Sequence, residues 1–162
     1  MNAALRAQLA RRIRIASPAD WGNFTLLWTA FNAIYGGETD VRERSRVMAC
    51  IRRNFSERAA LRVLRAVSRS IDRILEIPPG NMLLDRYNPN FRAASHRCAA
   101  LYRNKRETSI SRLAAVGGVI YQVRCNLIHG DKDPDDARDR MLVNESLTVL
   151  RALVPALEEQ LV

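Results

Sequence analysis

The chain has 162 residues, a net charge of +9 and hydrophobic side chains at 48% of its positions. This length suits one domain with a buried core, so we expect a single domain over residues 1–162. No apolar run reaches the roughly 18 residues that cross a bilayer, which excludes a transmembrane helix and predicts no membrane partner. The arginine-rich N-terminus has no separate apolar block, so a secretory signal is not expected.

The positive charge is unevenly distributed along the chain. Residues 1–112 carry 21 basic and nine acidic side chains, a net +12, whereas residues 113–162 carry five basic and eight acidic ones, a net −3. Such an asymmetry favours a polyanionic partner, most often a nucleic acid. Compositional bias is the alternative interpretation, because arginine outnumbers lysine 24 to 2, as a GC-rich genome would produce. Charge alone does not separate the two.

The cysteines and histidines indicate the cellular compartment and the kind of site. Cys50, Cys98 and Cys125 are odd in number, far apart and without a CxxC pair. This spacing argues against a disulfide framework and a zinc site, and it fits a reducing cytoplasm. The two histidines, His96 and His129, do not complete a set of metal ligands. We therefore expect a cytoplasmic protein with no metal and no other cofactor.

The hydrophobic spacing is helical almost throughout, without strand-like alternation longer than a few residues. A first helix is expected over 3–15. Ser17-Pro18-Ala19-Asp20 is a typical start of a second helix, which should run to about Tyr35 and stop at Gly36-Gly37. Further helices are expected over 40–54, over 57–76 after the capping residue Ser56, over 92–105 and over 108–129.

An irregular segment and a final helix complete the expected fold. Residues 77–91, with Pro78-Pro79-Gly80, form the one long irregular stretch. Asp133-Pro134 is expected to open the last helix, and Pro155 should kink or break it. The chain contains no internal repeat. The expected fold class is therefore all-α, a helical bundle of about five to seven helices.

A stripe of arginines follows the helix expected over 57–76. The five side chains fall within an arc of roughly 80° opposite the apolar face, and they are Arg58, Arg62, Arg65, Arg69 and Arg73. Like charges four residues apart repel, and only Glu57, Asp72 and Glu76 lie near in sequence to offset them. RNA or an acidic partner protein is a natural counter-ion for the stripe, and a solvated helix face is the alternative.

Aromatic side chains mark the helix expected to end at Tyr35. Phe24, Trp28, Phe31 and Tyr35 share one stripe, which we expect to lie in the core. Asn32 lies beside them, and a polar amide on an apolar face must find hydrogen-bond partners. We expect Asn32 to clamp two helices together, with a position facing an active site as the alternative.

The run Arg124-Cys125-Asn126-Leu127-Ile128-His129-Gly130 ends the helix expected over 108–129. Arginine holds phosphate with a planar set of donors and keeps its charge, whereas histidine exchanges a proton near neutral pH. Such a pair can cleave RNA without a metal, because arginine stabilises the phosphate and histidine moves the proton. Taken alone, the spacing favours a surface arginine and a histidine at the negative end of a helix dipole.

Helix geometry limits what this pair can do in one chain. Five residues along an ideal helix turn about 500°, so Arg124 and His129 would point roughly 140° apart. They cannot both meet one phosphate from one regular helix. Gly130 permits the helix to end at His129, and a second protomer can supply the missing half of the site. We therefore expect a monomer to be poorly active.

Two segments together resemble the HEPN superfamily, especially its Apea-like branch. The segment from Leu27 to Tyr35 resembles the WxAFNxxY helix of that branch. Arg124 to Gly130 resembles the R-x4–6-H motif of the superfamily, and Asp139-Arg140-Met141-Leu142-Val143 resembles the start of its last helix. The resemblance covers the chain from about Trp21 to its end.

The resemblance implies a helical bundle that forms a two-fold homodimer, in which two R-x4–6-H motifs meet in one composite site. Many members are metal-independent endoribonucleases that act as toxins, in phage defence or in RNA processing. Carried over, Arg124 is the phosphate-binding cation and His129 the general base or acid, with 2′,3′-cyclic phosphate and 5′-hydroxyl products. Cys125 replaces the polar residue that often follows the family's arginine. Asn126, one position later, is expected to orient the phosphate or His129, or to face the partner.

Three functions remain open from the sequence. The first is a metal-independent endoribonuclease, with RNA as its substrate. The second is a non-catalytic module that binds RNA or an acidic partner through the arginine stripe. The third is an N-terminal helix pair that only dimerises a larger assembly. The resemblance also allows a partner protein, either an antitoxin or a nucleotidyltransferase.

Overall fold

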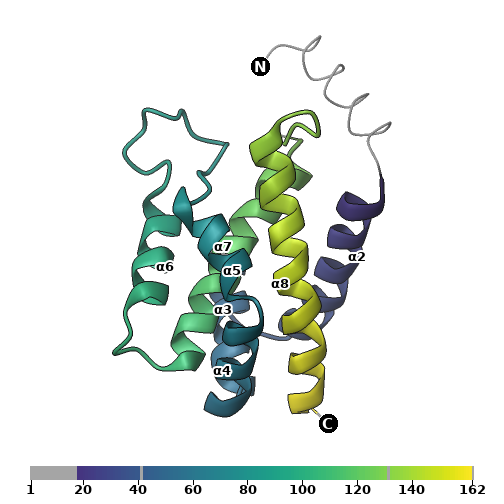
Figure 1. Ribbon diagram of the computed structural model, residues 1–162, viewed down its shortest axis with the longest axis vertical. Helices are drawn as coiled ribbons and strands as arrows, with labels where there is room; N and C mark the ends of the chain where they lie inside the picture. The colour runs from purple at the N-terminus through teal and green to yellow at the C-terminus, as the bar shows by residue number, and fades with distance from the viewer. Residues whose placement is uncertain (1–17, 41, 131, 162) are drawn as a thin grey trace.

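The computed structural model describes residues 18–40, 42–130 and 132–161, which form seven α-helices and no strand (Figure 1). The expected all-α bundle is therefore confirmed for these residues. The helix expected over 3–15 lies outside them. None of the seven has the length and apolar character that a bilayer crossing requires. The helices are α2 (Pro18–Tyr35), α3 (Glu43–Asn54), α4 (Glu57–Ala66), α5 (Ser68–Glu76), α6 (Ala93–Arg103), α7 (Ser109–Ile128) and α8 (Ala137–Leu161).

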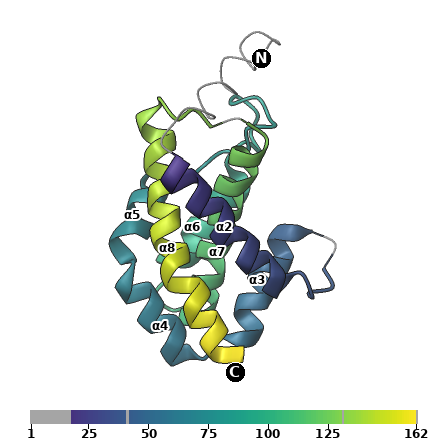
Figure 2. The ribbon, with the colours of Figure 1, turned by 90° about the vertical axis from the view of Figure 1, so that its right-hand side faces the viewer.

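Helix α7 is the centre of the bundle. It packs against α3, α4 and α6, whereas α8 packs mainly against α2 and α5 (Figures 1 and 2). Every residue from Leu113 to Ile120 is buried, as expected of a helix that is apolar on all sides. Two glycines in this stretch allow the close approach, since a side chain at Gly117 would meet α3 and one at Gly118 would meet both α3 and α6.

The aromatic stripe of α2 lies in the core, as predicted. Phe24, Trp28, Phe31 and Tyr35 are buried and stack or meet edge to face along the helix. Asn32 is exposed, so the prediction that it clamps two helices is wrong. One residue past Phe31, the helix has turned about 100° and the side chain reaches the surface.

Most helix ends follow the signals expected from the sequence. Helix α2 stops before Gly36-Gly37, and the Ser56 hydroxyl accepts a hydrogen bond from the Ala59 backbone N at the start of α4. Gly130 has a φ of 73° and ends α7 directly after His129. This left-handed conformation is the one that glycine adopts without strain.

Two expected helix boundaries and one expected helix break are wrong. The single helix over 57–76 is interrupted at Val67 (φ −121°, ψ 18°), which lets α4 pack on α7 and α5 on α8. Helix α8 begins at Ala137 instead of Asp133-Pro134, because the Asp136 carboxylate accepts from the Asp139 backbone N at 2.9 Å. Pro155 does not break α8, since the buried side chains on either side hold the helix against the core.

A buried ion pair holds the connection between α7 and α8. Lys132 is only 4% exposed, and its Nζ donates to Asp139 Oδ1 at 2.5 Å. The other oxygen of Asp139 accepts from the Asp133 backbone N at 2.8 Å. Removing one partner of such a pair leaves an uncompensated buried charge, whereas removing the charge itself is better tolerated.

Asp139→Ala is therefore expected to lower the free energy of unfolding by about 3 kcal/mol, because the Lys132 ammonium stays buried without its carboxylate. Lys132→Met is the matched variant, since it removes the charge and keeps the apolar stem, and it should cost clearly less. Urea unfolding measures both. Equal losses in the two variants would show that the ion pair is not what holds this connection.

Candidate functional site

Arg124 lies near the end of α7 and is paired with Glu43 of α3. Its Nη1 is 3.2 Å from Glu43 Oε2, while Glu43 Oε1 accepts from the Tyr35 hydroxyl at 2.6 Å. The Arg124 side chain is 24% exposed, and its buried Nε has no hydrogen-bond partner among the described residues. The Glu43 carboxylate thus joins α2, α3 and α7. It does not satisfy the buried Nε of Arg124.

The same carboxylate acts on Tyr35. Burial, the hydrogen bond to Glu43 and the negative charge of Glu43 together raise the pKa of Tyr35 well above its usual value. The hydroxyl therefore stays protonated at physiological pH and remains a donor to Glu43. This keeps Glu43 fixed beside Arg124.

Arg124 also lines a narrow groove between α2 and α7. The groove has a volume of about 90 Å³. Asn32 is among the residues that line it. Ile128, an apolar side chain that is 54% exposed, lies on the same groove. The remaining lining residues are Phe24, Thr25, Trp28, Thr29 and Leu127.

His129 follows the last residue of α7 and is exposed. Its backbone N donates to Cys125 O at 3.0 Å, which completes the last turn of the helix. The end of α7, the segment 77–92 and the start of α8 lie at one end of the bundle (Figures 1 and 2). His129 lines a hollow that Arg124 does not line. One chain therefore places the two residues on different hollows, in agreement with the divergence expected from helix geometry.

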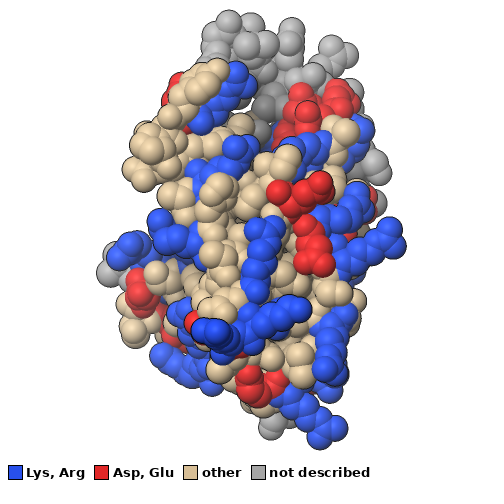
Figure 3. All heavy atoms as spheres, turned by 60° about the vertical axis from the view of Figure 1, so that its left-hand side comes forward, with Lys and Arg blue, Asp and Glu red and all other residues tan. Residues whose placement is uncertain are grey.

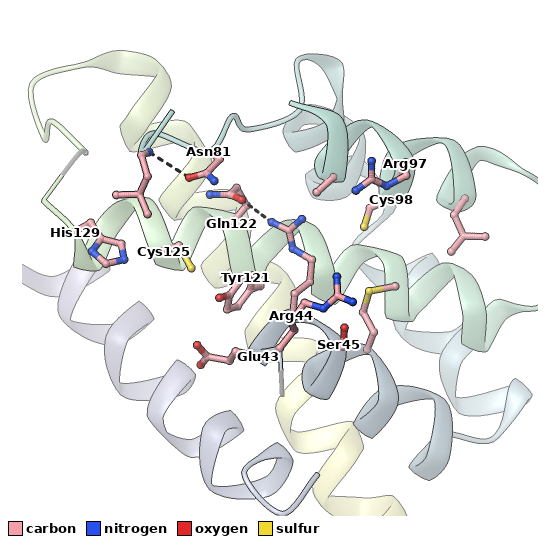
Figure 4. Close-up of a pocket in the computed structure, with 15 residues that line it drawn as sticks. Glu43, Arg44, Ser45, Asn81, Arg97, Cys98, Tyr121, Gln122, Cys125 and His129 are labelled. Carbon is pink, nitrogen blue, oxygen red and sulfur yellow. Dashed lines mark hydrogen bonds between the residues drawn. The ribbon is translucent and has the colours of Figure 1, made fainter. Parts of the chain in front are cut away.

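The hollow beside His129 has a volume of about 610 Å³. We call it the α3–α6–α7 hollow. In Figure 4, His129 lies at one end of it and Arg97 at the other. The segment before α6 contributes Asn81 and Leu83, and α6 contributes Ala94, Arg97, Cys98 and Leu101. The rest of the lining is Arg42, Glu43, Arg44, Ser45 and Met48, with Tyr121, Gln122 and Cys125 from α7.

Asn126 fastens the irregular segment to α7. It is 2% exposed, its Nδ2 donates to Gly80 O at 2.8 Å, and its Oδ1 accepts from Met82 N at 3.3 Å. The same oxygen accepts from Gln122 Nε2 at 3.0 Å, and Gln122 Oε1 accepts from Arg44 Nη2 at 2.5 Å. A hydrogen-bond chain therefore runs from α3 through α7 to the segment. Asn126 therefore holds this wall of the hollow, and both ends of its amide are engaged in doing so.

The arginine stripe is divided and partly neutralised. Arg58, Arg62 and Arg65 lie on α4 and Arg69 and Arg73 on α5, all of them exposed. Arg62 pairs with Glu159 at 3.0 Å, and Arg73 pairs with Glu145. These carboxylates belong to α8 and are remote in sequence.

Glu57, one of the three acidic residues expected beside the stripe, has another role. The Glu57 carboxylate accepts from the backbone N of Ser109 and of Ile110, so it caps the start of α7. Basic side chains spread over the face in Figure 3, interspersed with acidic ones, instead of forming a single strip.

Apart from His129 and Cys125, the residues around the hollow were not singled out from the sequence. Arg44, Arg97, Tyr121 and Gln122 lie on three helices, and no local spacing links them. Burial, the contact with Cys125 and the charge of Glu43 raise the pKa of Tyr121 to about 12, so its hydroxyl is neutral at physiological pH. Among the residues described, no group of three or more His, Cys, Asp or Glu could hold a metal ion.

No protein-family model matches the chain, and no curated protein or solved structure was found to be similar to it. The resemblance to the HEPN superfamily therefore remains an interpretation of short motifs. Function has to be argued from the site itself.

Asn126→Ala is expected to lower the free energy of unfolding by about 2 kcal/mol, because Gly80 O and Met82 N lose their buried partner. Hydrogen exchange should also become faster in residues 77–92 and stay unchanged in α8. Asn144→Ala, at an exposed position of α8, is the control and should change neither quantity. Unaltered exchange in the Asn126 variant would mean that the segment is held by other contacts.

Proposed function

We propose that the chain is a metal-independent endoribonuclease whose active site is completed by a second copy of the chain. One observation carries the proposal. An exposed His129 ends α7, five residues after a partly buried Arg124 whose Nε has no partner in the described part of the chain. A proton-exchanging group and a fixed cation are the groups that cleavage through the 2′-hydroxyl of RNA requires.

The need for two copies follows from the two hollows. Arg124 lines the α2–α7 groove and His129 lines the α3–α6–α7 hollow, so one chain does not direct both at one phosphate. A two-fold axis near the end of α7 would bring the His129 of one copy towards the Arg124 of the other. The exposed Ile128 on the groove gives such an interface an apolar contact.

The proposed reaction uses only groups of the chain and the RNA. His129 takes the proton of the 2′-hydroxyl, whose oxygen attacks the neighbouring phosphorus. The bond from phosphorus to the 5′-oxygen breaks, and that oxygen receives the proton that His129 took up. Arg124 holds the phosphate while charge develops on its oxygens, and Glu43 orients the guanidinium. The products are a 2′,3′-cyclic phosphate and a 5′-hydroxyl.

Two further observations fit this function. The two short motifs resemble the HEPN superfamily, many of whose members are endoribonucleases in toxin, phage-defence or RNA-processing roles. The three cysteines are free in the structure, which suits a cytoplasmic protein. An antitoxin or nucleotidyltransferase partner belongs to the same proposal.

A non-catalytic module that binds RNA or an acidic protein is the second candidate. The Arg124–Glu43 pair favours it, because Arg124 already has a counter-ion. Binding would then depend on Arg58, Arg65 and Arg69. These residues of the stripe are exposed, and the described residues provide no ion pair for them. Binding of this kind weakens steeply as salt rises.

Cleavage of total RNA in EDTA tests the enzyme. The wild type is expected to cut and to leave 2′,3′-cyclic phosphate ends. His129→Ala should be slower by about 100-fold or more, because the proton-transfer group is lost. His96→Ala is the matched control, since it removes the chain's other histidine, which is exposed on α6 and outside the hollow, and it should cut like the wild type.

The chemistry of the RNA ends and the salt dependence of RNA binding distinguish the two candidate functions. Equal cleavage by the wild type and His129→Ala would refute the assignment of His129. If none of the proteins cuts while all bind RNA in a salt-dependent manner, the binding module becomes the better account.

A further inference from the structure

We propose that the α3–α6–α7 hollow binds a phosphorylated nucleoside, with the phosphate on its arginines and the base on its apolar wall. The ligand is either a free nucleotide or one nucleotide unit of an RNA strand. This inference goes beyond the proposed cleavage, because it does not require His129 to act in catalysis.

The size of the hollow fits such a ligand. Sites for small molecules and cofactors typically span about 300–1,000 Å³, and this one has about 610 Å³. It is framed by helices on several sides and by the segment that Asn126 holds in place. The hollow is therefore a fixed feature of the bundle.

The positive charge of the hollow favours an anionic ligand. Arg42, Arg44 and Arg97 line it, and for none of them do the described residues supply an ion pair. Glu43 is the one carboxylate in the lining, and it is already engaged by Arg124 and Tyr35. Within the described part of the chain, these three cations therefore have no counter-ion of their own.

Two other acidic groups add no negative charge at physiological pH. Burial raises the pKa of the Cys98 thiol, and the pKa of Tyr121 is raised to about 12. Both side chains are therefore neutral there. Neither side chain therefore offsets the positive charge of the three arginines at physiological pH.

Arg44 is pre-oriented inside the hollow. Its Nη2 donates to Gln122 Oε1 at 2.5 Å, and its guanidinium carbon lies 5.4 Å from the centre of the Tyr121 ring. Its Nε is buried and has no hydrogen-bond partner within the described chain. An arginine fixed in this way with an unsatisfied donor is suited to phosphate, which accepts several N–H groups at once.

The hollow also has a surface that suits a base. Met48, Leu83 and Leu101 give it an apolar surface, and the Tyr121 ring adds an aromatic face. The Asn81 Oδ1 accepts from Leu83 N at 3.2 Å, which leaves the amide nitrogen of Asn81 for the edge of a base. A phosphate site next to an apolar and aromatic surface distinguishes a nucleotide from a simple inorganic anion.

Binding is tested with two kinds of probe that the protein cannot cleave through a 2′-hydroxyl. One is a fluorescent 2′-O-methyl hexanucleotide, followed by anisotropy, and the others are the four nucleoside 5′-monophosphates, followed by calorimetry. Arg97→Glu is the first variant, because Arg97 is exposed and its replacement should leave the core intact. The matched control is Arg151→Glu, an identical charge change at an exposed position of α8 outside the hollow.

Arg97→Glu is expected to weaken binding by at least about tenfold, and Arg151→Glu by less than about twofold, at the same salt concentration. Ala94→Trp is the second variant, since it fills the hollow and leaves every charge in place. It should weaken binding as strongly as Arg97→Glu does.

The two probes distinguish the sources of the ligand. Binding of monophosphates identifies a free nucleotide site, whereas binding of the hexanucleotide alone identifies a subsite for an RNA strand. Equal losses in Arg97→Glu and Arg151→Glu would overturn the proposal in favour of general charge attraction. Absence of binding by both probes, or full binding by Ala94→Trp, would overturn it as well.

Discussion

The burial of α7 on all sides determines where the functional side chains can lie. From Leu113 to Ile120 the helix has no exposed residue, and two glycines let α3 and α6 approach it closely. Its last two turns reach the surface again, and Arg124 and His129 lie there. The polar chemistry of the chain is therefore concentrated where the central helix leaves the core.

Two networks of polar side chains hold the residues of the candidate site in place. Glu43 links Tyr35 of α2 to Arg124 of α7, and the chain from Arg44 through Gln122 to Asn126 links α3 to the segment before α6. The first network fixes a cation beside the α2–α7 groove, and the second fixes the wall of the larger hollow. Because buried polar groups without partners are costly, both networks resist rearrangement.

The sequence was sufficient to predict those parts of the fold that local chemistry determines. Gly36-Gly37, Ser56 and Gly130 mark helix ends because their preferences for caps and left-handed backbone act within a few residues. The break at Val67 was missed because the apolar periodicity continues across it, and only packing on α7 and α8 requires it. The start of α8 was misplaced because Asp133-Pro134 looks like a helix start, although Asp136 caps the helix.

The site was predictable only where its residues are neighbours in sequence. Arg124 and His129 share one short run, so their divergence on the helix could be worked out in advance. The counter-ions Glu145 and Glu159 of the arginine stripe, and the grouping of Arg44, Arg97 and Gln122, arise from contacts between distant helices. Such contacts leave no periodic trace in a single sequence.

The central claim is that two copies of the chain form one active site. Mixing Arg124→Ala with His129→Ala tests it most directly, because each variant lacks one required group. The account predicts that the separate variants are inactive and that the mixture regains a substantial part of the RNA cleavage, since a mixed dimer combines an intact Arg124 with the partner's intact histidine. A mixture that stays inactive, although differently tagged copies co-purify as dimers, would contradict it.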